Sequence, residues 1–441
     1  MGQRLLQLPN SFFTRSLTNA GGRRKIIFID RLLSYYVVSL KVYVSSFLLV
    51  PVLCGKNNIL FVRSYTIYSK SKAMGVVMSV IGGYYGGGRA SCDGAALTEI
   101  SRAMIMYGGE RQAFIKGRIG LSVGLVRGEN DSSGLYFLEK GSEVLAAVIS
   151  GETRCIGPDG ILREYSNRVC LDGAGLDGEF SAAVCDGRDE LIILRRGELA
   201  PPLYYGVCGG DVAFASRVPG LFGFLGGCFV KRDILREHLT EAAGRYSATD
   251  LYCGVYAVER NTGLHFCPTG ASCFSLRDPC GESLPTDEIS CGGGLFLCPD
   301  TEELRDLLIE ILTAFDYPQF DAFMPSFLRD MRSGGAVTDY SLCMDTRYSE
   351  ERRERMFALC GRRARTVPPS AQDYGQRELK GMEDALRAML EADSCGVYEA
   401  VLGRDWRGAI EKEKNTVRRI RIEGMLWQTA FWYERYNVSL I

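Results

Sequence analysis

The stretch ELIILRRGELAPPLYYGVCGGDVAFASRVPG, residues 190–220, decides the fold class of this chain. Its short runs of apolar and β-branched residues are typical of strands, and Pro201-Pro202 interrupts them because proline has no N–H to donate to a sheet. The Gly209-Gly210 pair between two apolar runs predicts a β-hairpin over residues 203–216. Together with the apolar run 180–185, the pattern predicts a β-meander near the middle of the chain. These strands are apolar on both faces, so we expect both faces to be covered.

Length and composition indicate an enzyme-sized globular protein. The chain has 441 residues, of which 46% are hydrophobic, and a chain of this length is expected to form two or three domains with substantial cores. Its net charge of −1 argues against a dedicated nucleic-acid binder. The 16 cysteines contain no C-x-x-C pair, which favours free thiols in a reducing cytoplasm over a disulfide framework. A zinc site formed by His265 and the cysteines at 267–298 is an alternative, although their spacings fit no common zinc knuckle.

Residues 1–77 differ from the rest of the chain, because they are rich in Lys and Arg and contain the single acid Asp30. The apolar run 32–54 is long enough to span a bilayer, and Arg23-Arg24-Lys25 before it would favour a cytoplasmic N-terminus. Lys41 in the middle of the run argues against a span. Three interpretations stay open: a dispensable leader, a membrane anchor and a targeting peptide. We therefore expect a cytoplasmic protein, anchored to a membrane only if residues 32–54 span it.

Three sequence patterns resemble one family. Pro202-Leu203-Tyr204-Tyr205 and Phe214-Ala215-Ser216 follow in the order seen in the closing strands of the class II glutamine amidotransferase domain of asparagine synthetases. The segment MSVIGG, residues 78–83, resembles the Met-Cys-Gly-Ile-Ala-Gly start of that domain. Arg196 and Arg217 depart from the pattern, since the family has Asp and Glu at these positions.

The resemblance implies a set of site residues. Ser79 stands in place of the family's catalytic Cys, whose freed α-amino group serves as the base for its own side chain. Ser150-Gly151-Glu152 resembles the family's Asn-Gly-Glu, so Ser150 would help to hold the oxyanion, and Gly151 and Glu152 would help to hold glutamine. Arg127 is the nearest candidate for the glutamine-binding Arg. A polar strand end followed by a glycine turn explains residues 150–152 equally well.

The C-terminal part is expected to be helical. A capping signal at Asp300-Thr301-Glu302-Glu303 opens one helix that ends near Pro318, and apolar stripes predict further helices over 376–391 and about 405–436. We also predict a helix over 231–245 and a strand over 251–258. The aromatic ending, Leu426 to Val438, resembles the end of asparagine synthetases. The basic cluster Arg418, Arg419 and Arg421 is interpreted as a solvated helix face.

The resemblance as a whole implies an α+β protein, in which a layered αββα amidotransferase-like domain of the N-terminal-nucleophile type precedes a mainly helical domain. The expected divisions are a leader at 1–77, the amidotransferase-like domain at 78–230, its end and a linker at 231–300, and a reduced synthetase-like domain at 301–441. ATP and Mg are expected for the family, but Ser333-Gly334-Gly335 is the only trace of a nucleotide loop.

Two functions follow from these expectations. The first is glutamine-dependent amide formation of the asparagine-synthetase kind, with activity weak or lost because the nucleophilic Cys is replaced. The second is a catalytically inactive relative that binds a partner or small metabolite, for instance in a peptide-modification pathway. Glutamine or a related amino acid is the expected ligand, and neither nucleic acid nor a metal site is expected.

Overall fold

The structure is a computed structural model. Its residues from Ser45 to Ile441 form one compact unit. The structure describes residues 50–54, 59–66, 79–88, 91–104, 109–125, 132–140, 143–153, 160–168, 176–186, 188–197, 200–240, 246–276, 301–320, 376–392 and 396–441. Arg127, the Ser333-Gly334-Gly335 trace and the predicted linker at 292–294 lie outside them.

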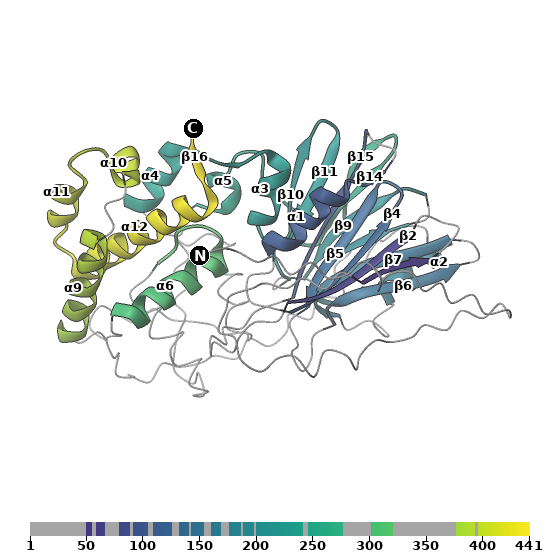
Figure 1. The fold of residues 1–441 in the computed structure, drawn as a ribbon, viewed down its shortest axis with the longest axis horizontal. Helices are drawn as coiled ribbons and strands as arrows, with labels where there is room; N and C mark the ends of the chain where they lie inside the picture. The colour runs from purple at the N-terminus through teal and green to yellow at the C-terminus, as the bar shows by residue number, and fades with distance from the viewer. Residues whose placement is uncertain are drawn as a thin grey trace, which may run out of the picture. The chain divides into compact units, whose positions relative to one another are not determined.

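An eight-stranded antiparallel sheet contains the start of the predicted amidotransferase-like domain (Figure 1). Its strands, in spatial order, are β1 (Val50–Cys54), β2 (Ile59–Thr66), β4 (Gly109–Lys116), β5 (Ile119–Leu125), β3 (Val80–Tyr85), β11 (Asp211–Ala215), β10 (Tyr204–Cys208) and β13 (Tyr256–Ala257).

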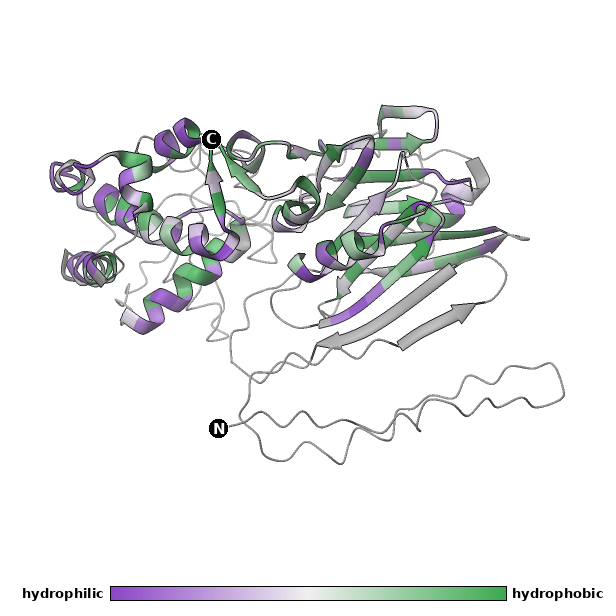
Figure 2. Cartoon of the chain, turned by 45° about the horizontal axis from the view of Figure 1, so that its top comes forward, coloured by the Kyte–Doolittle hydropathy of each residue, from purple (hydrophilic) through white to green (hydrophobic). Residues whose placement is uncertain are grey.

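A second, six-stranded antiparallel sheet contains the remaining central strands. Its spatial order is β15 (Gly270–Ser275), β14 (Thr262–Cys267), β9 (Leu191–Arg196), β8 (Gly178–Cys185), β7 (Glu143–Thr153) and β6 (Gly134–Lys140). The apolar residues of both sheets, which Figure 2 shows in green along the strands, join in one buried cluster that includes Ile81 and Phe214 from the first sheet and Val148 and Ile193 from the second. The two sheets therefore share a core.

Helices cover the other faces of the sheets. Helices α1 (Gly94–Met104) and α3 (Pro219–Leu225) contact β3, β5, β10 and β11 of the eight-stranded sheet. Helix α2 (Gly160–Arg168) contacts β6 and β7 and buries Ile161, Leu162 and Tyr165 against the second sheet. The expectation that strands apolar on both faces are covered on both faces is confirmed for β8, β9 and β11, whose residues are buried along nearly their whole length.

The Gly209-Gly210 hairpin is confirmed, but the predicted meander is wrong. β10 and β11 pair antiparallel with Cys208 opposite Asp211, and both glycines have positive φ (59° and 87°), as a two-residue turn requires. β8 and β9, however, pair in the six-stranded sheet, whereas β10 and β11 belong to the eight-stranded one. The chain passes between the sheets at Pro201-Pro202, where the missing N–H groups prevent a continuous ladder.

The C-terminal residues form helices that share a core with the outer face of the eight-stranded sheet. Trp427 and Trp432 are buried in a cluster that also contains Tyr84 and Tyr204. Strand β12 (Cys228–Val230) pairs in parallel with the last strand, β16 (Val438–Leu440). The helices are α4 (Arg232–Thr240), α5 (Ala248–Leu251), α6 (Thr301–Phe315), α9 (Gln376–Ala392), α10 (Val397–Leu402), α11 (Trp406–Glu411) and α12 (Thr416–Tyr436).

Three expectations about element boundaries are corrected. The predicted strand 251–258 is reduced to β13, because the Ser247 hydroxyl caps α5 at its start and Gly254 adopts positive φ. The helix predicted over 405–436 is divided, since the Asn415 side chain accepts a hydrogen bond from the N–H of Arg418 and starts α12 anew. Residues 150–153 continue strand β7 instead of forming a turn.

The predicted leader includes two of the strands. β2 pairs with β4 along its length, from Leu60 opposite Ile115 to Thr66 opposite Gly109, so residues 50–54 and 59–66 extend the eight-stranded sheet. The last residues of the apolar run 32–54 form β1, and the rest of that run lies outside the described residues. In the described parts of the chain, no helix combines the length and the apolar character that crossing a membrane requires.

Candidate functional site

Ser79 and Ser150, which are 71 residues apart in sequence, lie in direct contact. Ser79 immediately precedes β3 in one sheet, and Ser150 lies in β7 of the other. The Ser150 hydroxyl donates a hydrogen bond of 2.5 Å to the backbone carbonyl of Ser79. Both residues are buried, with 2% and 0% of their surface exposed. The contact brings together the two positions that the sequence nominates for catalysis.

The backbone beside Ser150 is held by further serine hydroxyls. The N–H of Gly151 donates to Ser133 Oγ at 3.0 Å, and the N–H of Thr153 donates to Ser132 Oγ at 3.3 Å. Gly151 has φ of +109°, and a Cβ at this position would lie 2.3 Å from the carbonyl oxygen of Glu179. This segment of β7 therefore requires glycine at 151 for both conformational and steric reasons. Glu152, the next residue, is exposed.

Ser181 is a further serine beside Ser150, and no sequence motif indicated it. Ser79, Ser132, Ser133, Ser150 and Ser181 are together called the serine group. It lies opposite Ser150 in the β7–β8 pairing, is fully buried, and donates from its hydroxyl to the carbonyl of Pro201 at 2.5 Å. A serine in the otherwise apolar strand FSAAVC was the available signal. This hydrogen bond holds Pro201, which lies in the segment that passes between the two sheets. Pro201 also lies next to Gly151, since an added Cβ on Gly151 would be 3.2 Å from Pro201 Cδ.

Two arginines at the end of β9 are buried nearby in the sheet. Arg195 lies opposite Ser181, and its Nη2 donates to the carbonyl of Ala200 at 2.8 Å. Arg196, which departs from the family pattern, is 1% exposed and donates from Nε to the carbonyl of Leu176 at 3.1 Å. Guanidinium groups remain charged when buried. Arg195 lies on the same face of the sheet as Ser181, whereas Arg196 lies on the opposite face, because successive side chains alternate along a strand.

Three of the described thiols, those of Cys92, Cys185 and Cys228, are not activated as nucleophiles in their present surroundings. Burial raises the pKa of the Cys92 thiol to about 12 and raises the pKa values of Cys185 and Cys228 as well. These thiols stay protonated at neutral pH. Cys267 differs, because a hydrogen bond with the Thr269 hydroxyl lowers its pKa. Over the parts of the chain that are described, no group of three or more His, Cys, Asp and Glu side chains is arranged to hold a metal ion.

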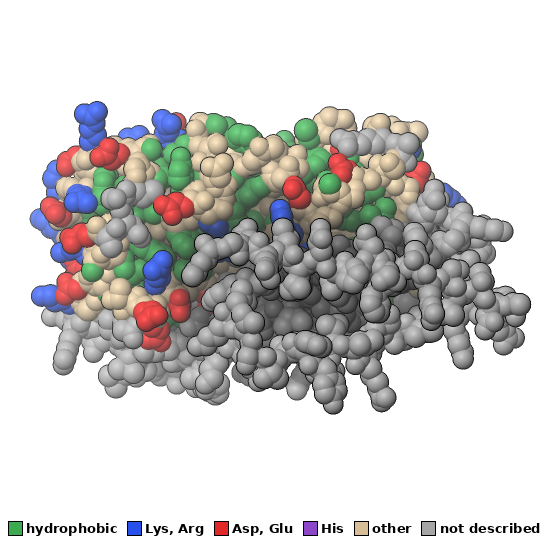
Figure 3. Space-filling model, viewed as in Figure 1, with side chains coloured by type: hydrophobic (Ala, Val, Ile, Leu, Met, Phe, Trp, Pro, Cys, Tyr) green, Lys and Arg blue, Asp and Glu red, His purple; other side chains and the backbone are tan. Residues whose placement is uncertain are grey.

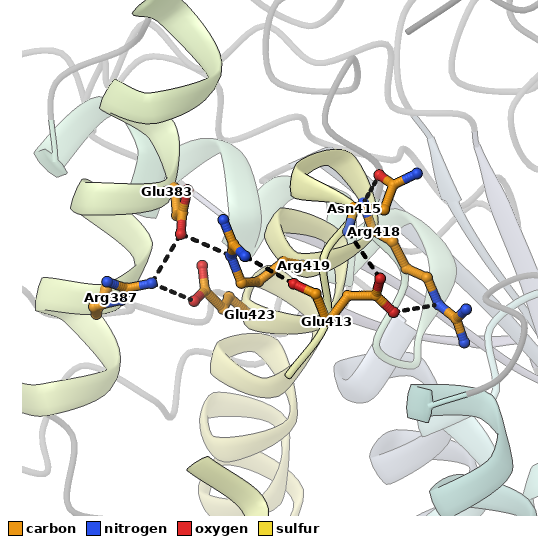
Figure 4. Close-up of polar contacts among 7 residues, drawn as sticks. All are labelled: Glu383, Arg387, Glu413, Asn415, Arg418, Arg419 and Glu423. Atoms are coloured by element: carbon orange, nitrogen blue, oxygen red, sulfur yellow. Dashed lines mark hydrogen bonds and ion pairs between the residues drawn. The ribbon is translucent and has the colours of Figure 1, made fainter. Parts of the chain in front are cut away.

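A second group of ionisable residues lies between α9 and α12 (Figure 4). One carboxylate oxygen of Glu383 accepts from Arg387 Nη2 at 2.8 Å and from Arg419 Nε at 2.7 Å. Arg387 also lies 3.7 Å from Glu423 Oε1. Arg419 therefore makes a part-buried ion pair, which differs from the solvated face predicted for the basic cluster. Charged side chains do gather over these helices on the face shown in Figure 3.

Glu423 is the buried carboxyl of this group. It is 2% exposed, and burial raises its pKa to about 7, an effect that Arg387 and Arg419 oppose and Glu383 reinforces. Its Oε2 atom is buried without a hydrogen-bond partner. The group therefore holds a carboxyl that titrates near neutral pH, which no sequence motif indicated.

The significant matches to known proteins come from solved structures. No family model and no curated protein sequence matches the chain significantly. A structure of glutamine phosphoribosylpyrophosphate (PRPP) amidotransferase from B. subtilis, complexed with ADP and GMP, matches 58% of this chain and 64% of its own, at 10% identity and a TM-score of 0.27. A structure described as the allosteric regulatory enzyme of purine biosynthesis matches the same shares at 11% identity and a TM-score of 0.27. The chain spans less than two thirds of the length of these proteins, and an identity and a TM-score this low do not assign their activity to it.

Proposed function

We propose that this chain is an asparagine-synthetase-like protein in which the two sheets form the scaffold of a glutamine amidotransferase, with glutamine-dependent amide formation weak or lost. The observation that carries the proposal is the hydrogen bond from Ser150 to Ser79. It joins, across two sheets, the two positions at which the family motifs nominate a nucleophile and an oxyanion donor. We further infer that the two sheets and their covering helices are a layered αββα domain of the N-terminal-nucleophile type, and that the C-terminal helices are a reduced synthetase-like domain.

The proposed chemistry is attack of the side chain of residue 79 on the side-chain amide of glutamine. The α-amino group of residue 79 would accept the hydroxyl proton, the C–N bond of the tetrahedral intermediate would break, and ammonia would leave with that proton. Water would then hydrolyse the resulting ester. Gly151 and Glu152 would contribute to holding glutamine, and Arg127 is the proposed partner of its carboxylate.

Three features of the chain explain why this activity would be weak. The nitrogen of Ser79 belongs to a peptide bond in the 441-residue chain, so it cannot act as a base. A serine hydroxyl is a poorer nucleophile than the family's thiol. The Ser150 hydroxyl donates to the Ser79 carbonyl and is therefore not directed at an oxyanion, and loss of one such donor lowers a rate by about a hundredfold or more.

The same hydrogen bond favours a second candidate function, that of a catalytically inactive binding protein. In this interpretation the Ser150 hydroxyl connects the sheets, and the site binds glutamine or a related metabolite without hydrolysing it, for instance within a peptide-modification pathway. ATP and Mg would be required for amide formation but not for binding. Measuring ammonia release from glutamine alongside glutamine binding separates the two candidates, since the inactive protein would bind glutamine and release no ammonia.

A further inference from the structure

The hairpin of β14 and β15, at one edge of the six-stranded sheet (Figure 1), carries a half-buried thiol beside an imidazole and a carboxylate. Side chains alternate between the faces of a strand, and Phe266 of β14 lies in the core between the sheets, so His265 and Cys267 share the other face. His265 Nε2 lies 3.1 Å from Glu190 Oε2. Glu190 directly precedes Leu191, the residue that pairs with Phe266, and therefore comes next to Cys267 as well. The three side chains form one group.

The Cys267 sulfur is held at the turn of the hairpin. It lies 3.1 Å from the Thr269 hydroxyl oxygen, and its S–H donates to the Gly270 carbonyl at 3.4 Å. When the thiol loses its proton, the Thr269 hydroxyl can donate to the sulfur, so this hydrogen bond favours the thiolate and lowers the pKa of Cys267. The Glu190 carboxylate, which is bonded to His265, opposes this effect less strongly. The thiolate is the form of cysteine that acts as a nucleophile.

A second, independent feature lies behind the hairpin. Tyr85, the last residue of β3, is 3% exposed, and its hydroxyl is buried with no hydrogen-bond partner among the residues that the structure describes. Its ring lies beside Phe266, with 6.1 Å between the ring centroids. Burial raises the pKa of this hydroxyl, the nearby Arg118 guanidinium lowers it, and a negative charge on Cys267 raises it further, so the hydroxyl lies close to the thiol. A buried O–H without an acceptor costs free energy, which a change at the sulfur can relieve.

A half-buried thiol that is stabilised as thiolate reacts readily with a disulfide, because the thiolate attacks one of its sulfur atoms. We propose that Cys267 is a site of reversible modification by small-molecule disulfides. A new S–S bond forms between Cys267 and one half of the disulfide, the old S–S bond breaks, and the other half leaves as a thiolate. The thiol proton of Cys267 passes to water. The disulfide is the oxidant, and an excess of free thiol reverses the reaction. This goes beyond the proposed function, since it uses no residue of the serine group.

The rate of mixed-disulfide formation in the full chain tests the proposal. The reduced protein is mixed with bis(2-hydroxyethyl) disulfide, a neutral reagent, and the remaining thiols are blocked at intervals with N-ethylmaleimide. Peptide mass spectrometry then gives the modified fraction of each cysteine. Cys273, an exposed thiol of β15 in the same hairpin, is the matched control. At about pH 7, Cys267 is expected to react at least about threefold faster than Cys273. An equal or slower rate at Cys267 would overturn the proposal.

Variants test the part that the turn plays. Thr269→Val removes the hydroxyl beside the sulfur, so it is expected to slow the reaction of Cys267 about threefold and to move the inflection of its pH–rate profile to higher pH. Thr269→Ser keeps a hydroxyl and should retain the original profile. Thr98→Val is the control, because its hydroxyl also bonds to a backbone carbonyl but lies in α1. An unchanged inflection in Thr269→Val contradicts the proposed site. If that variant does not fold, the rates of Cys267 and Cys273 in the unaltered chain decide.

Discussion

Arg217, two residues after the end of β11, forms a bidentate ion pair with the fully buried carboxylate of Asp316, 99 residues further along the chain. Its Nε lies 2.9 Å and 3.0 Å from the two carboxylate oxygens, and the N–H of Val218 donates to the same carboxylate at 3.2 Å. Ser216, the residue before Arg217, accepts a hydrogen bond at its Oγ from the N–H of Ile81 near the start of β3. The pair therefore connects the strand that follows Ser79 to the helical part. It also gives a structural role to Arg217, at which the sequence departs from the pattern that it resembles.

Removing either partner of this pair is expected to destabilise the protein. Arg217→Ala leaves the Asp316 carboxylate buried without its guanidinium, and Asp316→Ala leaves the arginine without its anion, so each should lower the free energy of unfolding by about 3–5 kcal/mol. The double variant should cost less than the sum of the two. Urea denaturation measures these values, with Arg232→Ala as a surface control. Strictly additive losses would contradict direct coupling of the two residues.

Stability is expected to depend on pH through Glu423. Its pKa is about 7 in the folded protein, against a usual value of 4.5, so the folded state holds a proton that the unfolded state releases at lower pH. The contribution of this bound proton to the free energy of unfolding is complete below about pH 4.5. It is lost as pH rises through 7, by roughly 3 kcal/mol in all. Glu423→Gln should flatten this part of the stability profile. Glu399→Gln, an exposed residue of α10, should retain the slope of the unaltered protein.

The predicted dispensability of residues 1–77 can be tested in two steps. A chain beginning at Ser45, where the compact unit starts, is expected to unfold with the same free energy as the full chain. A chain beginning at Met78 also lacks β1 and β2 and leaves the edge of β4 unpaired. Such an edge promotes association, so this chain should be less stable and should self-associate in analytical ultracentrifugation. A stable monomer beginning at Met78 would show that the whole leader is dispensable.

Gly151→Ala is expected to lower the stability of the folded protein more than an alanine substitution at another glycine with positive φ. Gly209 has φ of +59° with nothing within 4 Å of an added Cβ, so Gly209→Ala should cost only the left-handed backbone penalty of about 1–2 kcal/mol. At Gly151 the added Cβ would also meet the Glu179 carbonyl. The difference between the two variants in thermal unfolding measures that clash. Equal losses would contradict the tight packing of β7 on β8.

Local signals in the sequence predicted some elements and missed others for identifiable reasons. The hairpin at Gly209-Gly210 was predictable because two adjacent glycines specify the turn by themselves. The assignment of β9 and β10 to different sheets was not, since Pro201-Pro202 indicates a break but not where the chain goes next. Arg217 appeared only as a departure from a motif, because its partner Asp316 is distant in sequence. Ser79 and Ser150 were nominated by resemblance alone, and no local pattern indicated that they touch.

The most direct test of the central claim is ammonia release from glutamine after the α-amino group of residue 79 is freed. A protease recognition sequence in place of residues 72–78 allows cleavage immediately before residue 79, while β1 and β2 remain available to pair with β4. Before cleavage, neither the Ser79 protein nor its Ser79→Cys variant should release ammonia. After cleavage, Ser79→Cys should release ammonia measurably, the Ser79 protein far less, and Ser79→Ala none. Equal ammonia release by cleaved Ser79→Cys and Ser79→Ala, or brisk release by the uncleaved chain, would contradict an amidotransferase centre at Ser79 and Ser150.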